Sequence, residues 1–317
     1  MGQVELHRHL DISIRTRTLL QLAQKRGLEP QSTSIASFTD KFILRKPLRD
    51  LNAVLAKFKI FQKILDRPEV LATVAFEAVE DCRAEGITQV ELRFSPSFVC
   101  ELNSMSWEDA LSGFESGIRR ALESYPEINV GLICIASREY GAQVASDLVD
   151  FFLRNRNRFI GIDLAGNESD FPCRLFEEPF KKASKHGAKI TVHAGEASGP
   201  ESMWEAIDLL GATRIGHGIA CVKDGALMKY LAENKICLEM CPTSNWITGA
   251  VESLQAHPLP IALRAGVPVC INTDDPGIFG VTLSHEAGLC ENLMGLSKKE
   301  IELCQEHARA ASFIHKA

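Results

Sequence analysis

The feature that most constrains the fold of this chain is a recurring pattern of a short apolar segment followed by a longer amphipathic one. Eight short segments are rich in β-branched and other apolar residues, as buried strands are. They cover residues 3–7, 89–94, 129–135, 159–163, 189–193, 214–217, 236–240 and 267–272. Helical periodicity is found between several of them, at 68–85, 107–124, 202–210 and 226–233. The pattern indicates a parallel sheet with helical crossovers.

Eight strand–helix units in one chain predict an α/β fold of the closed (β/α)₈ TIM-barrel type. An open doubly wound sheet that binds a dinucleotide is disfavoured, because no Gly-x-Gly-x-x-Gly follows an early strand. Single-domain barrels reach this length, so we expect one hydrolase domain over residues 1–317. The first crossover is long and has an apolar helical pattern at 51–61. We expect a helical lid inserted after strand 1; a helix packed on the flank of the barrel is the alternative.

The composition is that of a soluble globular protein, with 45% hydrophobic and 24% charged residues. A net charge of −6 gives no basic surface for nucleic acid or for an anionic membrane. No apolar run approaches the roughly 18–20 residues of a membrane span, and the N-terminus does not resemble a signal peptide. We therefore expect a cytoplasmic protein, a monomer or weak homo-oligomer, whose partner is a small molecule rather than nucleic acid or membrane. The ten scattered cysteines are expected to be buried reduced thiols.

Chemically active side chains gather at the ends of the predicted strands, and these ends meet at one mouth of a parallel barrel. They are His7, His9, His193, His217, Asp274 and Asp275. His7 and His9 are two residues apart on an extended segment, so both imidazoles point to the same side. Four of the nine histidines lie at strand ends, a distribution that scattered histidines would rarely show. The pattern predicts a metal site.

Three imidazoles and one carboxylate suit Zn²⁺ and leave room for a water molecule. The predicted ligands are His7, His9, His193 and Asp274. A bound ion would lower the pKa of that water and supply hydroxide as a nucleophile. His217 is then free to orient the water or to take its proton. A site in which Asp274 and Asp275 share the ion stays open.

Glu196 follows His193 across a flexible Ala-Gly step that can turn the chain back over the same pocket. We expect Glu196 to be the acid that protonates the substrate; an exposed loop carboxylate is the alternative.

Seven motifs, in order along essentially the whole chain, resemble the bacterial type of the adenosine deaminase family of metal-dependent amidohydrolases. They lie at 7–11 (His-x-His-Leu-Asp), 91–96, 163–166, 193–196, 214–218, 241–245 and 272–276. The His-x-Glu and Pro-Cys-x-x-Cys signature of the other zinc deaminase type is absent from the sequence.

The resemblance implies zinc-dependent hydrolysis of adenosine or 2′-deoxyadenosine to inosine or 2′-deoxyinosine plus ammonia, in purine salvage, with one Zn²⁺ per chain. The resemblance implies the same four zinc ligands. It also implies a catalytic role for Asp274 and a substrate contact for His9. The remaining roles implied are Glu196 as the acid for purine N1, His217 for the hydroxide, Asp275 for N7, the Gly166 amide for N3 and Asp11 for the ribose 5′ end. A gate helix is implied at Leu51, Val54, Leu55 and Phe58, where Val54 is smaller than the aromatic residue of animal members.

One residue departs from the family pattern. Ile12 stands where the family has glycine after His-x-His-Leu-Asp. The metal ligands precede this position, so the departure bears on the ribose end of the pocket, next to Asp11. Adenine deaminase and aminodeoxyfutalosine deaminase, which acts on a 5′-extended adenosine, therefore remain alternatives with the same mechanism.

Two remoter alternatives are a non-catalytic homologue that binds purine nucleosides and a two-metal hydrolase on the same barrel. The first should have lost a ligand or the acid, and neither is missing. The second commonly has a bridging lysine on an inner strand, whereas residues 163–166 contain none.

Overall fold

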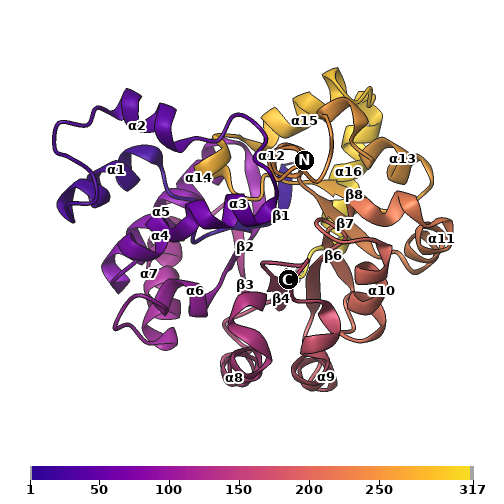
Figure 1. Cartoon of the computed structure of the whole chain (residues 1–317), viewed down its shortest axis with the longest axis horizontal. Coiled ribbons are helices and arrows are strands. Elements are labelled where there is room, and N and C mark those ends of the chain that lie inside the picture. Colours follow the sequence, from indigo (N-terminus) through magenta and orange to yellow (C-terminus); the bar gives the residue numbers. More distant parts are fainter. Residues whose placement is uncertain (1, 315–317) are drawn as a thin grey trace.

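The computed structural model describes residues 2–314 and shows eight parallel strands in the middle of the molecule with helices around them (Figure 1). Neighbouring strands pair in chain order. The strands are β1 (Gln3–His9), β2 (Ile87–Phe94), β3 (Asn129–Ser137), β4 (Gly161–Ala165), β5 (Ile190–Ala194), β6 (Arg214–His217), β7 (Cys237–Met240) and β8 (Val269–Ile271). The barrel prediction is confirmed. Met1 and residues 315–317 of the predicted domain lie outside the described residues.

The barrel closes between its first and last strands, next to the predicted site. The backbone N–H of Asp274 donates to the carbonyl of His7 at 3.0 Å, and the N–H of His9 donates to the carbonyl of Asp274 at 2.9 Å. Arg8 and Asp274 form the corresponding parallel bridge. The backbone bonds that close the barrel therefore bring three of the predicted ligands together.

Seven of the eight strands differ from their predicted limits by one or two residues at an end, and the fourth and the eighth bear on the site. The fourth, predicted at 159–163, runs over Gly161–Ala165, because Phe159 packs against Phe94 and Phe151 before the ladder begins. Asp163 is consequently in the middle of β4 and not at its end. The eighth, predicted at 267–272, is only Val269–Ile271.

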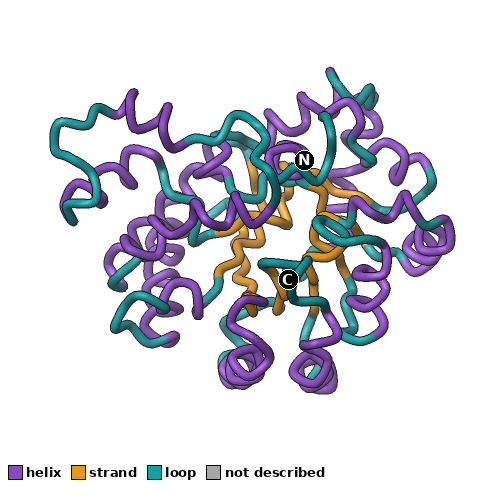
Figure 2. Tube along the Cα trace, viewed as in Figure 1, coloured by secondary structure: helices purple, strands orange, loops and turns teal. Residues whose placement is uncertain are grey.

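Helices connect the strands and form the outer layer of the barrel (Figure 2). The α-helices are α1 (Thr16–Lys25), α2 (Ile35–Phe42), α3 (Leu51–Leu55), α4 (Lys59–Ile64), α5 (Pro68–Ala84), α6 (Pro96–Cys100), α7 (Trp107–Ser124), α8 (Gly141–Arg154), α9 (Glu177–Lys185), α10 (Pro200–Asp208), α11 (Gly225–Asn234), α12 (Pro242–Ile247), α13 (Leu259–Arg264), α14 (Pro276–Phe279), α15 (Leu283–Asn292) and α16 (Lys298–Ala311). Short 3-10 helices are η1 (Ala56–Phe58), η2 (Arg138–Tyr140), η3 (Cys173–Phe176), η4 (Ile219–Lys223) and η5 (Leu254–Ala256). The four predicted helices correspond to α5, α7, α10 and α11.

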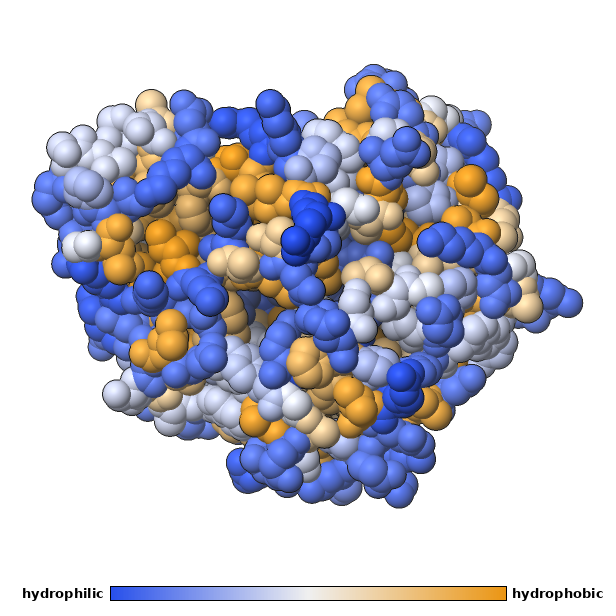
Figure 3. Space-filling view, in the orientation of Figure 1, coloured by the Kyte–Doolittle hydropathy of each residue, from blue (hydrophilic) through white to orange (hydrophobic). Residues whose placement is uncertain are grey.

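The long first crossover folds into helices α1 to α4 between β1 and the start of α5. The continuous helix predicted at 51–61 is wrong in detail, because the segment is divided into α3, η1 and α4. Leu55 and Phe58 line cavities at the barrel mouth, while Phe61 is buried. Hydrophobic residues are visible in the recessed surface around this segment (Figure 3). The segment therefore borders the mouth, and its movement as a lid stays a prediction.

The barrel interior beneath the site is ionic. Arg93 pairs with Asp163 and with Glu239, both at 2.7 Å, and Arg214 pairs with Glu239 at 2.6 Å and with Glu91 at 2.7 Å. All five side chains are almost completely buried. Buried ion pairs are weak evidence for stability, but they fix the positions of their groups. Here they hold two carboxylates under the histidine cluster.

All ten cysteines are free, and all except the half-buried Cys100 are buried, as predicted. Within residues 2–314, none of the helices combines the length and apolarity required to cross a membrane.

Helices α5 and α7 approach each other closely at Gly117. A methyl group there would lie 2.1 Å from the carbonyl oxygen of Ala72. We expect Gly117→Ala to lower the free energy of unfolding by about 1–3 kcal/mol through overpacking, although alanine favours a helix. The control is Gly288→Ala in α15, where the nearest atom is 4.0 Å away; it should raise that free energy by about 0.5–1 kcal/mol. Denaturant unfolding of both variants checks this, and equal effects would contradict it.

Candidate active site and metal centre

The predicted metal ligands converge at the mouth of the barrel. Three of the four predicted ligands, His7, His193 and Asp274, form a buried group with His217, and their ligand atoms lie within 4.8 Å of one another; His9 falls in a second group with Asp274 and Asp275. His9 Nε2 lies 3.3 Å from His193 Nε2 and 3.2 Å from Asp274 Oδ1, and His7 Nε2 lies 3.2 Å from the same oxygen. Ligand atoms around a tetrahedral zinc ion, with bonds of about 2.0–2.1 Å, are about 3.3 Å apart. The spacing of the predicted ligands matches that geometry.

Two of these residues have a strained backbone. His217 has φ of 60° and Asp274 has φ of 63°, in the left-handed region that non-glycine residues seldom adopt. Strain of this kind is typical of functional sites, where the surrounding structure imposes it. For Asp274 the imposing contacts are the backbone bonds that close the barrel.

Buried carboxylates beneath the cluster orient two of the imidazoles. Glu239 Oε2 lies 2.8 Å from His7 Nδ1, and Asp163 Oδ2 lies 3.1 Å from His193 Nδ1. Burial alone would raise the pKa of Glu239, but the adjacent guanidinium groups hold it well below its usual range. Each ionised carboxylate accepts the Nδ1–H, which leaves the Nε2 lone pair free to bind a metal.

His7 Nε2 provides a test of whether a metal suits the site. It is buried and has no hydrogen-bond partner among the described residues. A buried polar atom without a partner is costly unless something binds it. With three imidazoles and a carboxylate around it, zinc fits this donor set.

The loop that carries Glu196 is held by another carboxylate. Glu168 accepts hydrogen bonds from the backbone N–H groups of Gly195, Glu196, Ala197 and Ser198, at 2.6, 3.1, 2.7 and 3.2 Å. Gly195 has φ of +69°, which turns the chain after β5. Glu196 is buried as a result. The alternative of an exposed loop carboxylate is wrong.

Glu196 has the environment of an acid. Thr248 Oγ1 donates to its Oε1 at 3.1 Å, and His217 Nε2 lies 3.6 Å from its Oε2. Burial raises the pKa of Glu196 to about 8, and the negative charges of Asp274 and Glu168 add to the effect. A carboxyl group in this position holds a proton that it can donate.

Two further carboxyl groups have a buried oxygen that lacks a partner in the described part of the chain. They are Asp275, through Oδ1, and Asp11, through Oδ1. Burial raises the pKa of Asp275 well above its usual value, and the charge of Asp274 adds to this. Asp11 accepts from the Ser95 N–H at 3.0 Å, and burial raises its pKa to about 6. Both groups can still bind a polar ligand.

Gly166 is at a position where a side chain cannot be placed. Its φ is +101°, and a methyl group there would lie 2.3 Å from Glu139 Oε2. Glu139 also accepts from the Asn167 N–H at 2.5 Å. Glycine is therefore required by the backbone and by Glu139, in addition to any close approach of a ligand.

Ile12 is accommodated without strain. Its side chain is buried in the core, and its backbone is not among the described residues with positive φ. The Gly277 backbone packs against the Ile12 carbonyl, where a methyl on Gly277 would lie 2.1 Å from that oxygen. Ile12 lines the outer cavity beside Asp11, so its effect is on the shape of the pocket.

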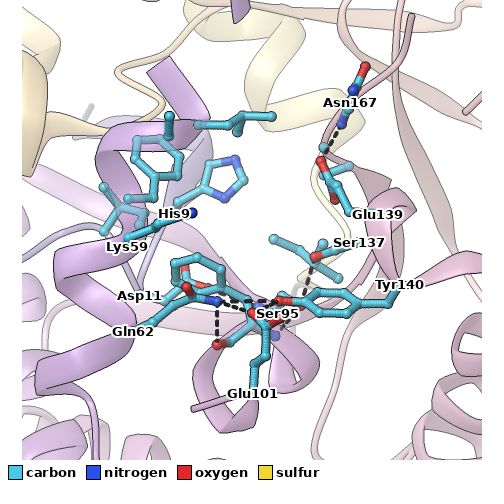
Figure 4. Close-up of a pocket in the computed structure, with 18 of the residues that line it drawn as sticks. His9, Asp11, Lys59, Gln62, Ser95, Glu101, Ser137, Glu139, Tyr140 and Asn167 are labelled. Atoms are coloured by element: carbon cyan, nitrogen blue, oxygen red, sulfur yellow. Dashed lines mark hydrogen bonds between the residues drawn. The ribbon is translucent and has the colours of Figure 1, made fainter. Parts of the chain in front are cut away.

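Two adjoining cavities lead from the cluster. The inner one, of about 50 Å³, is lined by His193, Glu196, His217 and both aspartates of the 274–275 pair. The outer one, of about 420 Å³, begins at His9 and Gly166, which line both. Figure 4 shows Asp11, Glu101 and Tyr140 at one end of the outer cavity and Glu139 at the other. The structure thus provides, beyond the cluster, a largely apolar cavity with polar side chains at both ends.

Several side chains that shape the site were missed at the sequence level. They are Asp163 and Glu239 beneath the histidines, Glu168 under the acid loop, Thr248 beside Glu196, and Asn245 with His257 behind His217. A signal existed for Glu239, a lone charge in an otherwise apolar strand. Glu168 and His257 have no such signal around them in the sequence.

Comparisons with known proteins agree with this geometry. The family model described as adenosine deaminase matches residues 2–317. The chain is 37% identical over 311 residues to an adenosine deaminase of Shewanella loihica, covering 98% of this chain and 94% of that protein. An adenine deaminase from Arthrobacter aurescens superposes with a TM-score of 0.91 at 25% identity, covering 99% and 94% of the two chains.

A third relative was solved with bound zinc. It is an amidohydrolase from Burkholderia ambifaria, with a TM-score of 0.90 and 26% identity, covering 99% of this chain and 86% of that one. With the family model matched over the whole barrel and the acid beside the histidine cluster, the chain belongs to the adenosine deaminase family and is a hydrolytic deaminase.

Proposed function

We propose that this protein converts adenosine and 2′-deoxyadenosine to inosine and 2′-deoxyinosine, releasing ammonia, with one zinc ion held by His7, His9, His193 and Asp274. The observation that carries the proposal is the position of Glu196. This buried acid, with a pKa raised to about 8, lies in the same small cavity as the ligand cluster. A proton donor next to a metal site is what hydrolysis of a purine amino group requires.

The residues of the chain divide the chemistry among them. Glu196 donates a proton to purine N1, which makes C6 more electrophilic. Asp275, protonated in its buried position, donates to N7, and the Gly166 N–H meets N3. Zinc, when bound, lowers the pKa of water toward neutrality and so makes a nucleophile available at neutral pH. His217, 3.6 Å from Glu196, lies where it can orient the attacking water.

The outer cavity favours a nucleoside over a free base. Its volume of about 420 Å³ would remain empty around adenine, whereas a ribose extends into it past Asp11. Asp11, Glu101 and Glu139 line the cavity, with Lys59 as the only lysine or arginine among the described lining residues. Carboxylates should repel a 5′-phosphate, which disfavours AMP.

The same cavity supports a second candidate, the deamination of a 5′-extended adenosine. A substituent on the 5′ carbon would pass Asp11 toward Glu101 and Tyr140, which are hydrogen-bonded to each other at 2.7 Å. The non-catalytic alternative has no such support, because the acid and every predicted ligand are brought together.

A substrate panel tests the proposal. Deamination of adenosine, 2′-deoxyadenosine, adenine, AMP and a 5′-extended adenosine is followed by ultraviolet absorbance. We expect kcat/KM for the two nucleosides to exceed that for adenine and AMP by at least about tenfold, a difference of about 1.4 kcal/mol in transition-state stabilisation. Turnover confined to adenine or to the extended nucleoside would contradict the substrate assignment and keep the mechanism.

A further inference from the structure

A chain of three buried side chains lies behind His217, away from the substrate. His257, which follows η5, accepts from the backbone N–H of Leu259 at its Nδ1, 3.1 Å away. Its Nε2 lies 3.2 Å from Asn245 Oδ1. Asn245, on α12, places Nδ2 3.0 Å from His217 Nδ1. The three side chains are at most 3% exposed, so water does not compete for these bonds.

The direction of each of these three hydrogen bonds follows from the first one, between the Leu259 N–H and His257 Nδ1. A backbone nitrogen can only donate, so His257 Nδ1 accepts, and the proton of the neutral ring is on Nε2. Burial lowers the pKa of His257 to about 3, which keeps the ring neutral. His257 Nε2–H then donates to Asn245 Oδ1, and this fixes the amide with its NH₂ toward His217. The Asn245 amide donates to His217 Nδ1, whose lone pair is thereby used.

We propose that His257 and Asn245 are positioning residues that hold neutral His217 as the Nε2–H tautomer. In that tautomer His217 is a hydrogen-bond donor at the reaction site. It cannot ligate the metal through Nε2, and it cannot take the first proton from water, because neither ring nitrogen has a free lone pair.

This assignment separates His217 from the other imidazoles of the cluster. His7 and His193 donate through Nδ1 to the carboxylates of Glu239 and Asp163, which leaves their Nε2 lone pairs free. His217 has the opposite arrangement, because an amide N–H and not a carboxylate faces its Nδ1. In the buried group of His7, His193, His217 and Asp274, His217 is therefore the residue whose hydrogen bonds do not leave a lone pair for the ion.

The surroundings of His217 Nε2 agree with a donor. Glu196 Oε2 lies 3.6 Å away and Asp274 Oδ2 lies 3.9 Å away. A lone pair would be repelled by the ionised Asp274, whereas an N–H is attracted to that carboxylate and to a water oxygen between the two groups. The tautomer of His217 does not depend on the proposed function. Only the identity of the group that receives the hydrogen bond from Nε2–H, the attacking water in adenosine deamination, rests on it.

The tautomer can be measured directly by nitrogen NMR on the zinc-loaded protein with ¹⁵N-labelled histidine. His217→Gln identifies the His217 signals by their loss. We expect His217 in the unaltered protein to carry its proton on Nε2 and none on Nδ1. A proton on Nδ1 would overturn the proposal, whatever the behaviour of any variant.

Asn245→Asp reverses the hydrogen bond to His217 with almost no change of side-chain shape. A carboxylate at this position accepts from both neighbouring imidazole rings, so His217 Nδ1 would have to donate. We expect a proton on His217 Nδ1, a fall in kcat of about 10²–10³-fold, the size of the loss when one preorganised hydrogen-bond donor is removed from an active site, and KM and zinc content close to the original values. His257→Gln keeps a donor toward Asn245 and should lower kcat by less than about tenfold, whereas His257→Leu, which has no donor, should resemble Asn245→Asp.

Unchanged kcat in a folded, zinc-loaded Asn245→Asp protein would overturn the positioning role. If the unaltered protein shows the Nε2–H tautomer but does not deaminate adenosine, the substrate proposal fails and the tautomer assignment stands. The two failures are therefore distinguishable.

Discussion

Replacing Glu196 with glutamine should lower kcat for adenosine by about 10²–10⁴-fold and leave KM within a few-fold of the original. Glutamine keeps the shape of the side chain and can still accept from Thr248, which bonds Glu196 at 3.1 Å. It cannot transfer a proton to N1, an interaction made fully only in the transition state. Steady-state kinetics measure the effect, with Glu233→Gln at an exposed position as the control that should change nothing.

The ionisation of Glu196 should also determine how kcat/KM changes at alkaline pH. Glu196 acts while protonated, so its contribution is present below its pKa and is lost as pH rises through it. Burial raises that pKa to about 8, and a bound dication would bring it closer to neutrality. We expect kcat/KM to fall above neutral pH in the unaltered protein and the residual activity of Glu196→Gln to lack that fall. An identical alkaline limb in both would assign it to another group.

Removing a metal ligand should have the second large effect. His193→Ala deletes an imidazole whose Nε2 lies 3.3 Å from that of His9, and whose Nδ1 is oriented by Asp163. We expect loss of bound zinc and of detectable turnover, because the nucleophile depends on the ion. Metal analysis after dialysis, together with the adenosine assay, measures both.

Glu239→Gln should weaken zinc binding without abolishing it, in contrast to His193→Ala. All ligands remain, but the group opposite His7 Nδ1 loses its charge, and we expect zinc affinity to fall by about 10–100-fold. A chelator competition titration measures this, with activity recovered at high zinc. A His193→Ala protein that kept zinc and turnover would show that the ligand set is wrong.

The barrel and the meeting of the proposed ligands at its mouth could be predicted from the sequence because both depend on local periodicity. Each strand is a short apolar run, and the residues at its end, such as His193 and His217, are placed at the mouth by the architecture alone. Even the pairing of His7 with His9 follows from the alternation of side chains along a strand.

The groups that tune those ligands could not be predicted in the same way. Glu239 meets His7 across 232 positions of sequence, and Glu168 meets Gly195 across 27, contacts that no periodicity encodes. Asp163 belongs to the motif at 163–166, but its role beneath His193 depends on the limits of β4. The division of the 51–61 segment into three helices likewise depends on packing at the barrel mouth.

The most direct test of a single catalytic zinc site is a zinc titration of the metal-free protein, followed by adenosine turnover. We expect no turnover without metal and a linear rise that ends at one zinc per chain, because a single cluster of His7, His9, His193 and Asp274 would hold one ion. Turnover that is independent of added metal, or a rise that continues to two ions per chain, would contradict it.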